Sequence, residues 1–570
     1  MLFSLFASVL IFVVVCLGLG WPVAATLRLD AGEKILATVA LSFTGTYLVA
    51  WSVYVLALPP AALWAIPVAA IGGALLRWPN WRTTCRAAPV RALLVGQLIV
   101  TAWCITALAT IFTYSGGGWA ADWYEHWERT RFFLDHSPLE TRFLGHYAVT
   151  ARPPLGNVVI GAFLAVTRDD FAHYQLVSTL LASLAFLPAA LLARRWGTAA
   201  SVAVMAALLL VNPSFLQNAT FAWTKLPAAF FVLTGLYFFL RARDPDAPPA
   251  AGPLTALCLA AGALTHYSAA PYCLVLGLAW LGFHRPPPAT RWWHGTGGMA
   301  VIAGLILTTW FGWAIAVYGP RETFLANSTV MSADARQGNQ LVKIALNLFD
   351  TVVPHFLRSF DRSLVAQTSA WGAWRDWFFQ VYQLNLPLGF GSVAGLAIVR
   401  EVIRRHRRAT KSERAGWAAS ILATIVLGIA VHGQRDHWGL AHICLQPLVL
   451  LGLAFLAARW EQLSTRWRRA LVAGAAVDLA CGIVLHLGVE SLAWERWLAP
   501  GRSMNDTLRT LSEPAQMNLI AKVTHHLAFF ADALAAPLIL PGTIAAGLLA
   551  FACWRVRPSP AAPPSPAHET

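Results

Sequence analysis

Apolar runs of about 16–22 residues recur along most of this 570-residue chain. Each run is long enough to cross a hydrocarbon core of roughly 30 Å as a single helix. Only 12% of the residues are charged, whereas soluble proteins carry about 25%. The sequence therefore predicts an all-α polytopic membrane protein.

The positions of these runs predict a bundle of about 15 transmembrane helices. We expect them at residues 2–21, 36–57, 60–76, 92–113, 173–193, 197–213, 226–240, 253–266, 269–283, 297–317, 386–400, 417–432, 440–458, 471–488 and 533–554. The first run has no basic segment before it and no small-residue cleavage site after it. It is expected to be a retained helix and not a cleaved signal peptide.

Basic residues cluster between alternate helices, and one side of the predicted bundle holds 25 of the 42 Lys and Arg but only 8 acids. This asymmetry follows the positive-inside rule and predicts an external N-terminus and a cytoplasmic C-terminus. The 33 Pro and the preference for Arg over Lys suggest a GC-rich bacterial genome, so we expect a bacterial inner-membrane location. Orientation and anionic headgroups account for the net charge of +15, so nucleic acid is excluded as a partner and membrane lipids are expected. The clusters are Arg28 and Lys34, Arg77 to Arg91, Arg194 and Arg195, Arg241 and Arg243, Arg285 and Arg291, 400–414, 459–469, and Arg555 and Arg557.

This topology predicts four regions. Residues 1–91 carry three N-terminal helices, and residues 92–460 form a core with external loops 114–172 and 318–385. Residues 461–554 hold the last helices and the external loop 489–532, and the Pro-rich tail 555–570 is expected to be disordered. Residues 156–167 are apolar but short, and we expect a re-entrant or interfacial segment there.

The first large external loop has the densest mixture of acids, bases and aromatic residues. Asp122, Glu125, His126 and Arg129 recur at the spacing of one helical face. Residues 120–134 are therefore expected to form an amphipathic juxtamembrane helix on the outer surface. This face is either a reactive site or a solvated face with internal ion pairs, and the spacing alone favours neither.

Further polar groups stand at predicted outer helix ends. Arg152 precedes Pro153 and Pro154 at the start of the short apolar segment, where it is either a headgroup contact or an ordinary snorkelling Arg. Lys225 stands at the outer end of the helix expected at 226–240. His266 and Tyr267 occupy an outer turn, and residues 431–447 contain three His. None of these His residues has the ligand spacing of a zinc site.

At these positions the sequence resembles the GT-C glycosyltransferases, and most of all the protein-mannosyltransferase and aminoarabinose-transferase superfamily. The resemblance covers about residues 92–460. It rests on an acid-bearing first external loop, on "RPPL" at 152–155 where the family reads K/R-P-P-L, and on the segments "TKLPAAFFVLTGLYFFLRAR" at 224–243 and "HICLQPLVLLGLAFLAAR" at 442–459. In this sequence Lys225 stands near the family's usual Asp, and Trp123 stands where the family has a second acid.

The resemblance implies a GT-C-like bundle with juxtamembrane helices in its external loops. It also implies periplasmic transfer of a sugar from a polyprenyl-phosphate donor to an unknown acceptor hydroxyl, with inversion. Asp122 matches the catalytic base, and Glu125 is the candidate for the missing second acid. Arg152, Lys225 and His266 are expected to contact the lipid phosphate, and the expected substrate contacts are Tyr124, His126, Tyr267 and His442. No cofactor is predicted. Some members of the wider superfamily need a divalent metal, but Asp122 and Glu125 alone are a thin ligand set and do not support one.

Two other classes of function remain open at this stage. An acid inside a predicted transmembrane helix, Asp478, is typical of a proton relay and favours a transporter or permease. Matching broken helices in two halves of the chain, which are typical of transporters, are not evident. A membrane scaffold without catalytic activity is the third class.

Overall fold

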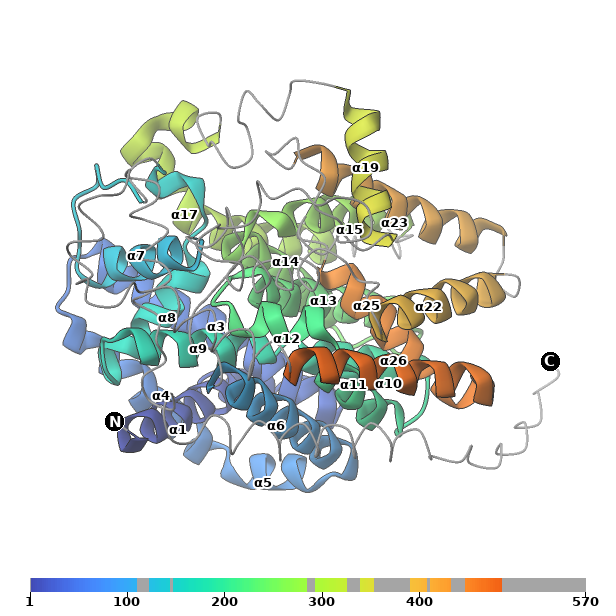
Figure 1. Ribbon diagram of the computed structural model, residues 1–570. Helices are drawn as coiled ribbons and strands as arrows, with labels where there is room; N and C mark the ends of the chain where they lie inside the picture. The colour runs from blue at the N-terminus through green and yellow to red at the C-terminus, as the bar shows by residue number, and fades with distance from the viewer. Residues whose placement is uncertain are drawn as a thin grey trace, which may run out of the picture.

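A computed structural model describes residues 2–109, 122–143, 147–283, 293–324, 339–352, 390–406, 411–431 and 446–483 (Figure 1). Within these ranges every regular element is a helix, and the prediction of an all-α protein is confirmed. The predicted helix at 533–554, the loop at 489–532 and the tail lie outside the described residues.

The N-terminal part packs two helices closely against each other. The elements are α1 (Leu2–Gly18), α2 (Trp21–Ala24), α3 (Ala31–Val55), η1 (Pro60–Trp64) and α4 (Ala65–Leu76). A Cβ added to Gly73 of α4 would lie 2.7 Å from the carbonyl oxygen of Gly18 in α1. Only glycine allows the two backbones to approach this closely, so the crossing of α1 and α4 is fixed by sequence.

The next part contains the loop that the sequence singled out. Its elements are α5 (Trp78–Arg86), α6 (Ala88–Ala109), α7 (Asp122–Leu134), η3 (Val149–Ala151) and α8 (Leu155–Val166). The short apolar segment forms α8, which packs on α7 and α3 and is buried along nearly its whole length. Other protein elements therefore cover it on all sides.

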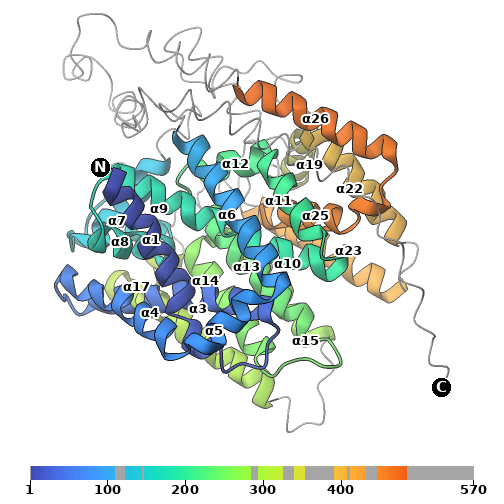
Figure 2. The ribbon, with the colours of Figure 1, turned by 90° about the horizontal axis from the view of Figure 1, so that it is seen from below.

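The central part consists of α9 (Phe171–Ser183), α10 (Phe186–Trp196), α11 (Ser201–Leu210), α12 (Pro213–Thr220), α13 (Lys225–Arg241), α14 (Ala251–Thr265), η4 (Tyr267–Ala269), α15 (Ala270–Phe283), the π-helical turn η5 (Trp293–Gly297) and α17 (Gly298–Phe324). α13 lies near the middle of the molecule in both views (Figures 1 and 2). Of its 17 residues, 16 are buried. This helix therefore forms the axis around which the core packs.

The C-terminal part comprises α19 (Gln340–Val352), α22 (Phe390–His406), α23 (Lys411–Val431), α25 (Gln446–Ala458), η7 (Trp460–Gln462) and α26 (Thr465–Ile483). The sequence analysis did not predict α19. It falls within a segment that was expected to be an external loop.

Five helices of the described residues are long and apolar enough to span a membrane, or seven if each of two bent pairs counts as one span. The predicted number of about 15 is therefore not established. One bent pair joins α11 to α12 at 72°. Several other predicted spans form apolar helices of only 10–17 residues, such as α14.

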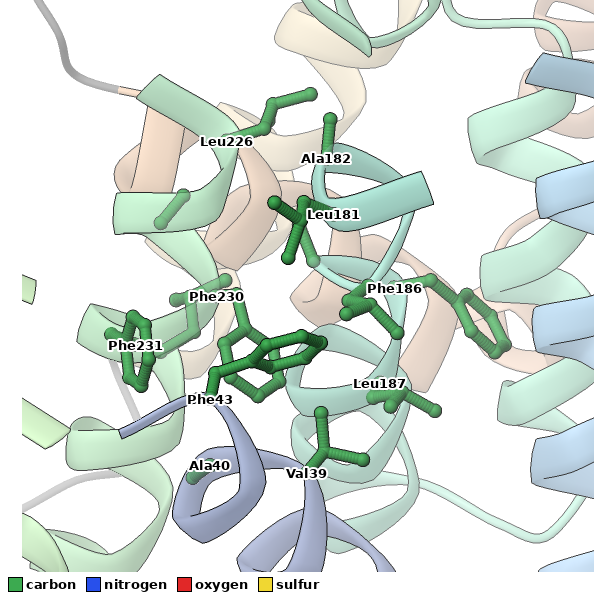
Figure 3. Packing of buried hydrophobic residues seen from close by; sticks show 14 of the residues in the cluster. Val39, Ala40, Phe43, Leu181, Ala182, Phe186, Leu187, Leu226, Phe230 and Phe231 are labelled. Carbon is green, nitrogen blue, oxygen red and sulfur yellow. The ribbon is translucent and has the colours of Figure 1, made fainter. Parts of the chain in front are cut away.

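The core around α13 is aromatic. Figure 3 shows Phe43 of α3 between Leu181 of α9, Phe186 of α10 and the pair Phe230 and Phe231 of α13. All five side chains are buried. Close van der Waals packing is a main source of helix association within a membrane, so these contacts hold the N-terminal helix α3 against the central part.

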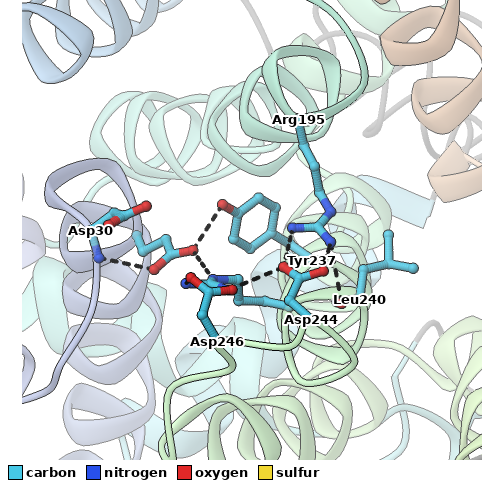
Figure 4. A network of polar contacts seen from close by, with 8 residues as sticks. Asp30, Arg195, Tyr237, Leu240, Asp244 and Asp246 are labelled. Atoms are coloured by element: carbon cyan, nitrogen blue, oxygen red, sulfur yellow. Dashed lines mark hydrogen bonds and ion pairs between the residues drawn. The ribbon is translucent and has the colours of Figure 1, made fainter. Parts of the chain in front are cut away.

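A charged network joins the same elements at one end of α13 (Figure 4). Arg241 donates from Nε to Glu33 at 3.0 Å and contacts Asp244 and Asp246. Arg195 forms a two-point contact with Asp244, with distances of 2.8 and 2.6 Å. The charge pattern assigned three basic clusters, 28–34, 194–195 and 241–243, to one side of the membrane. These contacts place the three clusters at one end of the bundle.

Candidate active site

The polar face of α7 is buried in protein. Glu125 is 0% exposed, and Arg129 and His126 are 2% and 3% exposed. The amphipathic helix was predicted correctly, but its polar face is not solvated. It packs toward η3 and α8, which close over it. The internal ion pairs that we considered for a solvated face are present, and they are buried.

Glu125 is held by two guanidinium groups. Nε of Arg129 donates to Oε1 at 2.8 Å, and NH2 of Arg152 donates to Oε2 at 3.2 Å. Arg129 also donates to the carbonyl oxygens of Val149 and Ala148, both at 2.9 Å. The carboxylate thus fixes the position of Arg152 across the loop that connects α7 to α8.

The ionisation of this group follows from its neighbours. Burial raises the pKa of Glu125, but Arg152 and then Arg129 outweigh it and lower the pKa to about 2. Burial and the charge of Arg152 also lower the pKa of His126, to about 3. At neutral pH, Glu125 is therefore a carboxylate and His126 is an uncharged imidazole. Its Nδ1 donates to Oδ1 of Asn157 at 3.2 Å.

The loop before Arg152 has two supports. Phe143 and Tyr147 exchange two backbone hydrogen bonds of 2.9 Å, and the guanidinium of Arg129 lies 4.2 Å from the centre of the Phe143 ring. The hydroxyl of Tyr267 donates to the carbonyl oxygen of Thr150 at 2.9 Å. Tyr267 was predicted to contact substrate, and the structure places it where it supports the backbone next to Arg152.

Three helix ends meet beside Arg152. A Cβ on Gly156, in the first turn of α8, would lie 2.7 Å from Cγ2 of Thr224 and 3.7 Å from Cγ2 of Thr265. Thr224 directly precedes Lys225, and Thr265 directly precedes His266. The start of α8, the start of α13 and the end of α14 therefore lie together. The convergence that the sequence analysis assumed is present for these segments.

The two basic groups at this junction are largely buried. Lys225 is 7% exposed, and its Nζ lies 3.6 Å from the centre of the Trp223 ring. His266 is also 7% exposed, and its Nδ1 lies 2.8 Å from Oγ of Ser268. Because helix N-termini attract anions, the starts of α8 and α13 add to the positive potential of Lys225 and Arg152.

Three of the predicted site residues cannot be placed in this geometry. Asp122 and Tyr124 lie in the first turn of α7, but their side chains are outside the described part of the structure. His442 also lies outside the described residues. Asp122 precedes Glu125 by three residues, which places its backbone on the same side of the helix.

Sequence reasoning missed two participants. Arg129 was noted on the helical face but was not assigned to the site, and Asn157 was not considered. The signal for Asn157 was weak, because one amide in an apolar run commonly satisfies a neighbouring polar group. The signal for Arg129 was its spacing of four residues from Glu125, which is typical of a helical ion pair.

Comparison with known proteins supports the class of enzyme. The family model of dolichyl-phosphate-mannose-protein mannosyltransferase matches residues 94–284, which run from α6 to the end of α15 and include the whole described junction. The predicted resemblance is confirmed over this segment, which is similar to protein mannosyltransferases. No curated protein sequence matched the chain.

Three solved structures are similar to the chain. ArnT from Cupriavidus metallidurans, bound to undecaprenyl phosphate and in the apo state, has TM-scores of 0.47 and sequence identities of 17% and 18%. In both cases the match covers 81% of this chain and 77% of that chain. The oligosaccharyltransferase of Archaeoglobus fulgidus in the apo form has a TM-score of 0.35 and 16% identity, over 74% of this chain and 58% of that one.

Proposed function

We propose that this enzyme transfers a sugar from a polyprenyl-phosphate donor to an acceptor hydroxyl on the periplasmic face of a bacterial inner membrane, with inversion. The name of the matched family specifies a donor whose sugar is carried on dolichyl phosphate. Dolichyl phosphate is a polyisoprenyl phosphate, so it belongs to the same chemical class as the lipid carrier of the proposed donor. The matched segment contains the junction of α8, α13 and α14.

The observation that carries this proposal is the meeting of two helix N-termini and two cations. Arg152 precedes α8, Lys225 begins α13, and Gly156 and Thr224 bring the two helix starts into contact. Sugar transfer leaves a negatively charged lipid phosphate. Fixed donors and cations aimed at developing charge are an effective form of catalysis in a site that excludes water.

The reaction requires a base for the acceptor. In this proposal Asp122 takes the acceptor proton while the acceptor oxygen attacks the anomeric carbon. The bond from that carbon to the phosphate oxygen breaks, and the lipid phosphate leaves with the bonding electrons. Arg152, Lys225 and His266 then stabilise the phosphate.

Of the two acids Asp122 and Glu125, we assign Glu125 a positioning role. Both of its oxygens already accept hydrogen bonds from guanidinium groups. Its low pKa makes it a poor proton acceptor at neutral pH. Its contribution would be to hold Arg152 in the direction of the phosphate. Tyr124, His126, Tyr267 and His442 remain the proposed substrate contacts, with His126 acting as an uncharged group.

The test uses the full-length protein in detergent, with undecaprenyl phosphate as a binding probe and polyprenyl-phosphate sugars as donors. Arg152→Ala is expected to weaken binding of the probe by roughly tenfold or more, because a charge-assisted contact of about 1.5–3 kcal/mol is lost. The matched control is Arg131→Ala, since Arg131 lies on α7 in an exposed ion pair with Asp135. Equal affinity of the Arg152 variant and the wild type would remove Arg152 from the donor site. Failure of the wild type to bind the probe would refute the proposed donor class.

The orientation in the membrane is part of the proposal. α13 has 17 residues and spans about 25 Å, with Lys225 at its start and Arg241 at its end. The network around Glu33 and Arg241 would therefore face the cytoplasm if Lys225 faces the periplasm. A single cysteine in place of Asp246, which is exposed, should react with a membrane-impermeant maleimide only in inverted vesicles. Labelling in right-side-out vesicles would reverse the topology.

A further inference from the structure

A second basic feature lies in the N-terminal part of the chain, outside the segment that the family model matches. Between Glu33 and Asp122 the sequence contains no acidic residue. Four arginines fall in this stretch, in and beside α5: Arg77, Arg82, Arg86 and Arg91. All four are exposed, and none forms an ion pair with any residue that the structure describes.

The direction of α5 is fixed by a buried tryptophan. α5 leaves the preceding helical segment at an angle of 78°. Trp21 is fully buried, and its Nε1 donates to the carbonyl oxygen of Arg77 at 3.3 Å. Its ring also contacts the ring of Trp81 edge-on, with 5.0 Å between ring centres. Arg82 and Arg86 are therefore carried on a short helix that turns sharply across the end of α4, with Arg77 directly before this helix and Arg91 near the start of α6.

An exposed apolar stripe leads directly to these arginines. Trp64, Val68, Ile71 and Leu75 recur at the spacing of one helical face, and each is 50–65% exposed. The opposite face of α4 packs on α1 at Gly73. In a membrane protein an exposed apolar face of this kind contacts acyl chains. The stripe ends at the bend where the basic helix begins.

We propose that α5 and the exposed face of α4 form a binding site for an anionic phospholipid. The headgroup phosphates would lie on Arg77, Arg82, Arg86 and Arg91, and the acyl chains would lie along the α4 stripe. Charge complementarity favours this occupant, because the surface offers four cations and no carboxylate of the described residues forms an ion pair with them. An exposed tryptophan, Trp78, stands at the boundary, where indole rings favour the headgroup level.

The experiment measures lipid binding to the full-length protein in a zwitterionic detergent. Cardiolipin is the probe, phosphatidylethanolamine is the comparison lipid, and native mass spectrometry reports the number of lipids bound. The test variant is Arg82→Gln with Arg86→Gln. The matched control is Arg466→Gln with Arg469→Gln, because these two arginines are exposed at the start of α26 and their replacement gives the same change in net charge.

Each arginine near a headgroup contributes roughly fivefold to the binding constant. We therefore expect the α5 variant to bind cardiolipin on the order of 30-fold more weakly, while the α26 control keeps wild-type affinity. High salt should weaken binding to the wild type in the same direction. Equal loss in the two variants would show a general charge effect and would overturn the proposal, as would unchanged binding in the α5 variant. If the α5 variant is isolated unfolded, the single variants Arg82→Gln and Arg86→Gln give the same comparison.

Discussion

The substitution Glu125→Gln tests whether the buried pair of arginines depends on this carboxylate. Glutamine keeps the size of the side chain but removes the charge between Arg129 and Arg152. The two guanidinium groups would then face each other without compensation, in a site where Glu125 is 0% exposed. Arg129 keeps its bonds to two backbone carbonyls, so Arg152 is the group that is expected to move.

The size of the effect follows from the pKa of Glu125, which lies at about 2 against an ordinary value of 4.5. A carboxyl group with a lowered pKa contributes stability that is fully present above its unfolded value and is lost as the pH falls through its folded value. This contribution corresponds to about 3 kcal/mol above pH 4.5. Removal of one partner from a buried ion pair typically costs about 3–5 kcal/mol, which agrees with this figure.

The assay is thermal unfolding in detergent, measured at pH 7 and at several values between pH 5 and pH 3. The control is Asp135→Asn, which breaks an exposed pair with Arg131 at the same spacing of four residues, at the end of the same helix. Such a pair contributes about 0–1 kcal/mol. Glu125→Gln should unfold at a clearly lower temperature than Asp135→Asn at pH 7, and the wild type should lose stability below pH 4.5. Equal unfolding midpoints for the two variants at pH 7 would refute the inference that Glu125 holds the two buried arginines in place.

Three further predictions concern the packing around this site and the charged network at the far end of the bundle. Gly156→Ala would place a Cβ 2.7 Å from Cγ2 of Thr224, so we expect the free energy of unfolding to fall by about 1–3 kcal/mol and sugar transfer to decrease. The control is Gly72→Ala, which should unfold like the wild type because Gly72 has open space around it. Tyr267→Phe removes a buried hydrogen bond worth about 1 kcal/mol and should raise the donor KM more than it lowers kcat in a steady-state assay. Glu33→Gln lies at the far end of the bundle and should lower the unfolding temperature by the equivalent of about 1–3 kcal/mol while the folded enzyme keeps its specific activity.

The order of the helices could be predicted because the apolar runs are long and the charged residues fall between them. Their lengths could not. The run that was expected at 197–213 ends as α11 at Leu210, and the chain bends by 72° into α12. Asn212 causes this break, since its side chain accepts from the backbone N–H of Phe215 and caps the next helix at Pro213. Hydropathy does not register a cap inside an apolar run.

The site was predicted in part because its residues stand at helix ends. Arg152, Lys225 and His266 span more than a hundred residues of the sequence, yet contacts of Gly156 with two threonines bring their segments together. Periodicity identified the polar face of α7 but not its environment. A face with two acids and two bases is typical of a solvated surface. Only the covering residues, Phe143 and the segment 147–152, show that the charges of Glu125, Arg129 and Arg152 neutralise one another in the interior.

The pairing of Glu125 also bears on which acid accepts the proton. A general base needs an accessible oxygen and a pKa near the working pH, whereas Glu125 is 0% exposed and its pKa is lowered to about 2. We propose Asp122 for this role, one turn earlier on α7. Transfer measured against pH should then keep its acidic limb in Glu125→Gln, although the donor KM rises as Arg152 loses its support. Asp122→Asn should abolish transfer but retain binding of undecaprenyl phosphate. An acidic limb that disappears in Glu125→Gln and persists in Asp122→Asn would exchange the two roles.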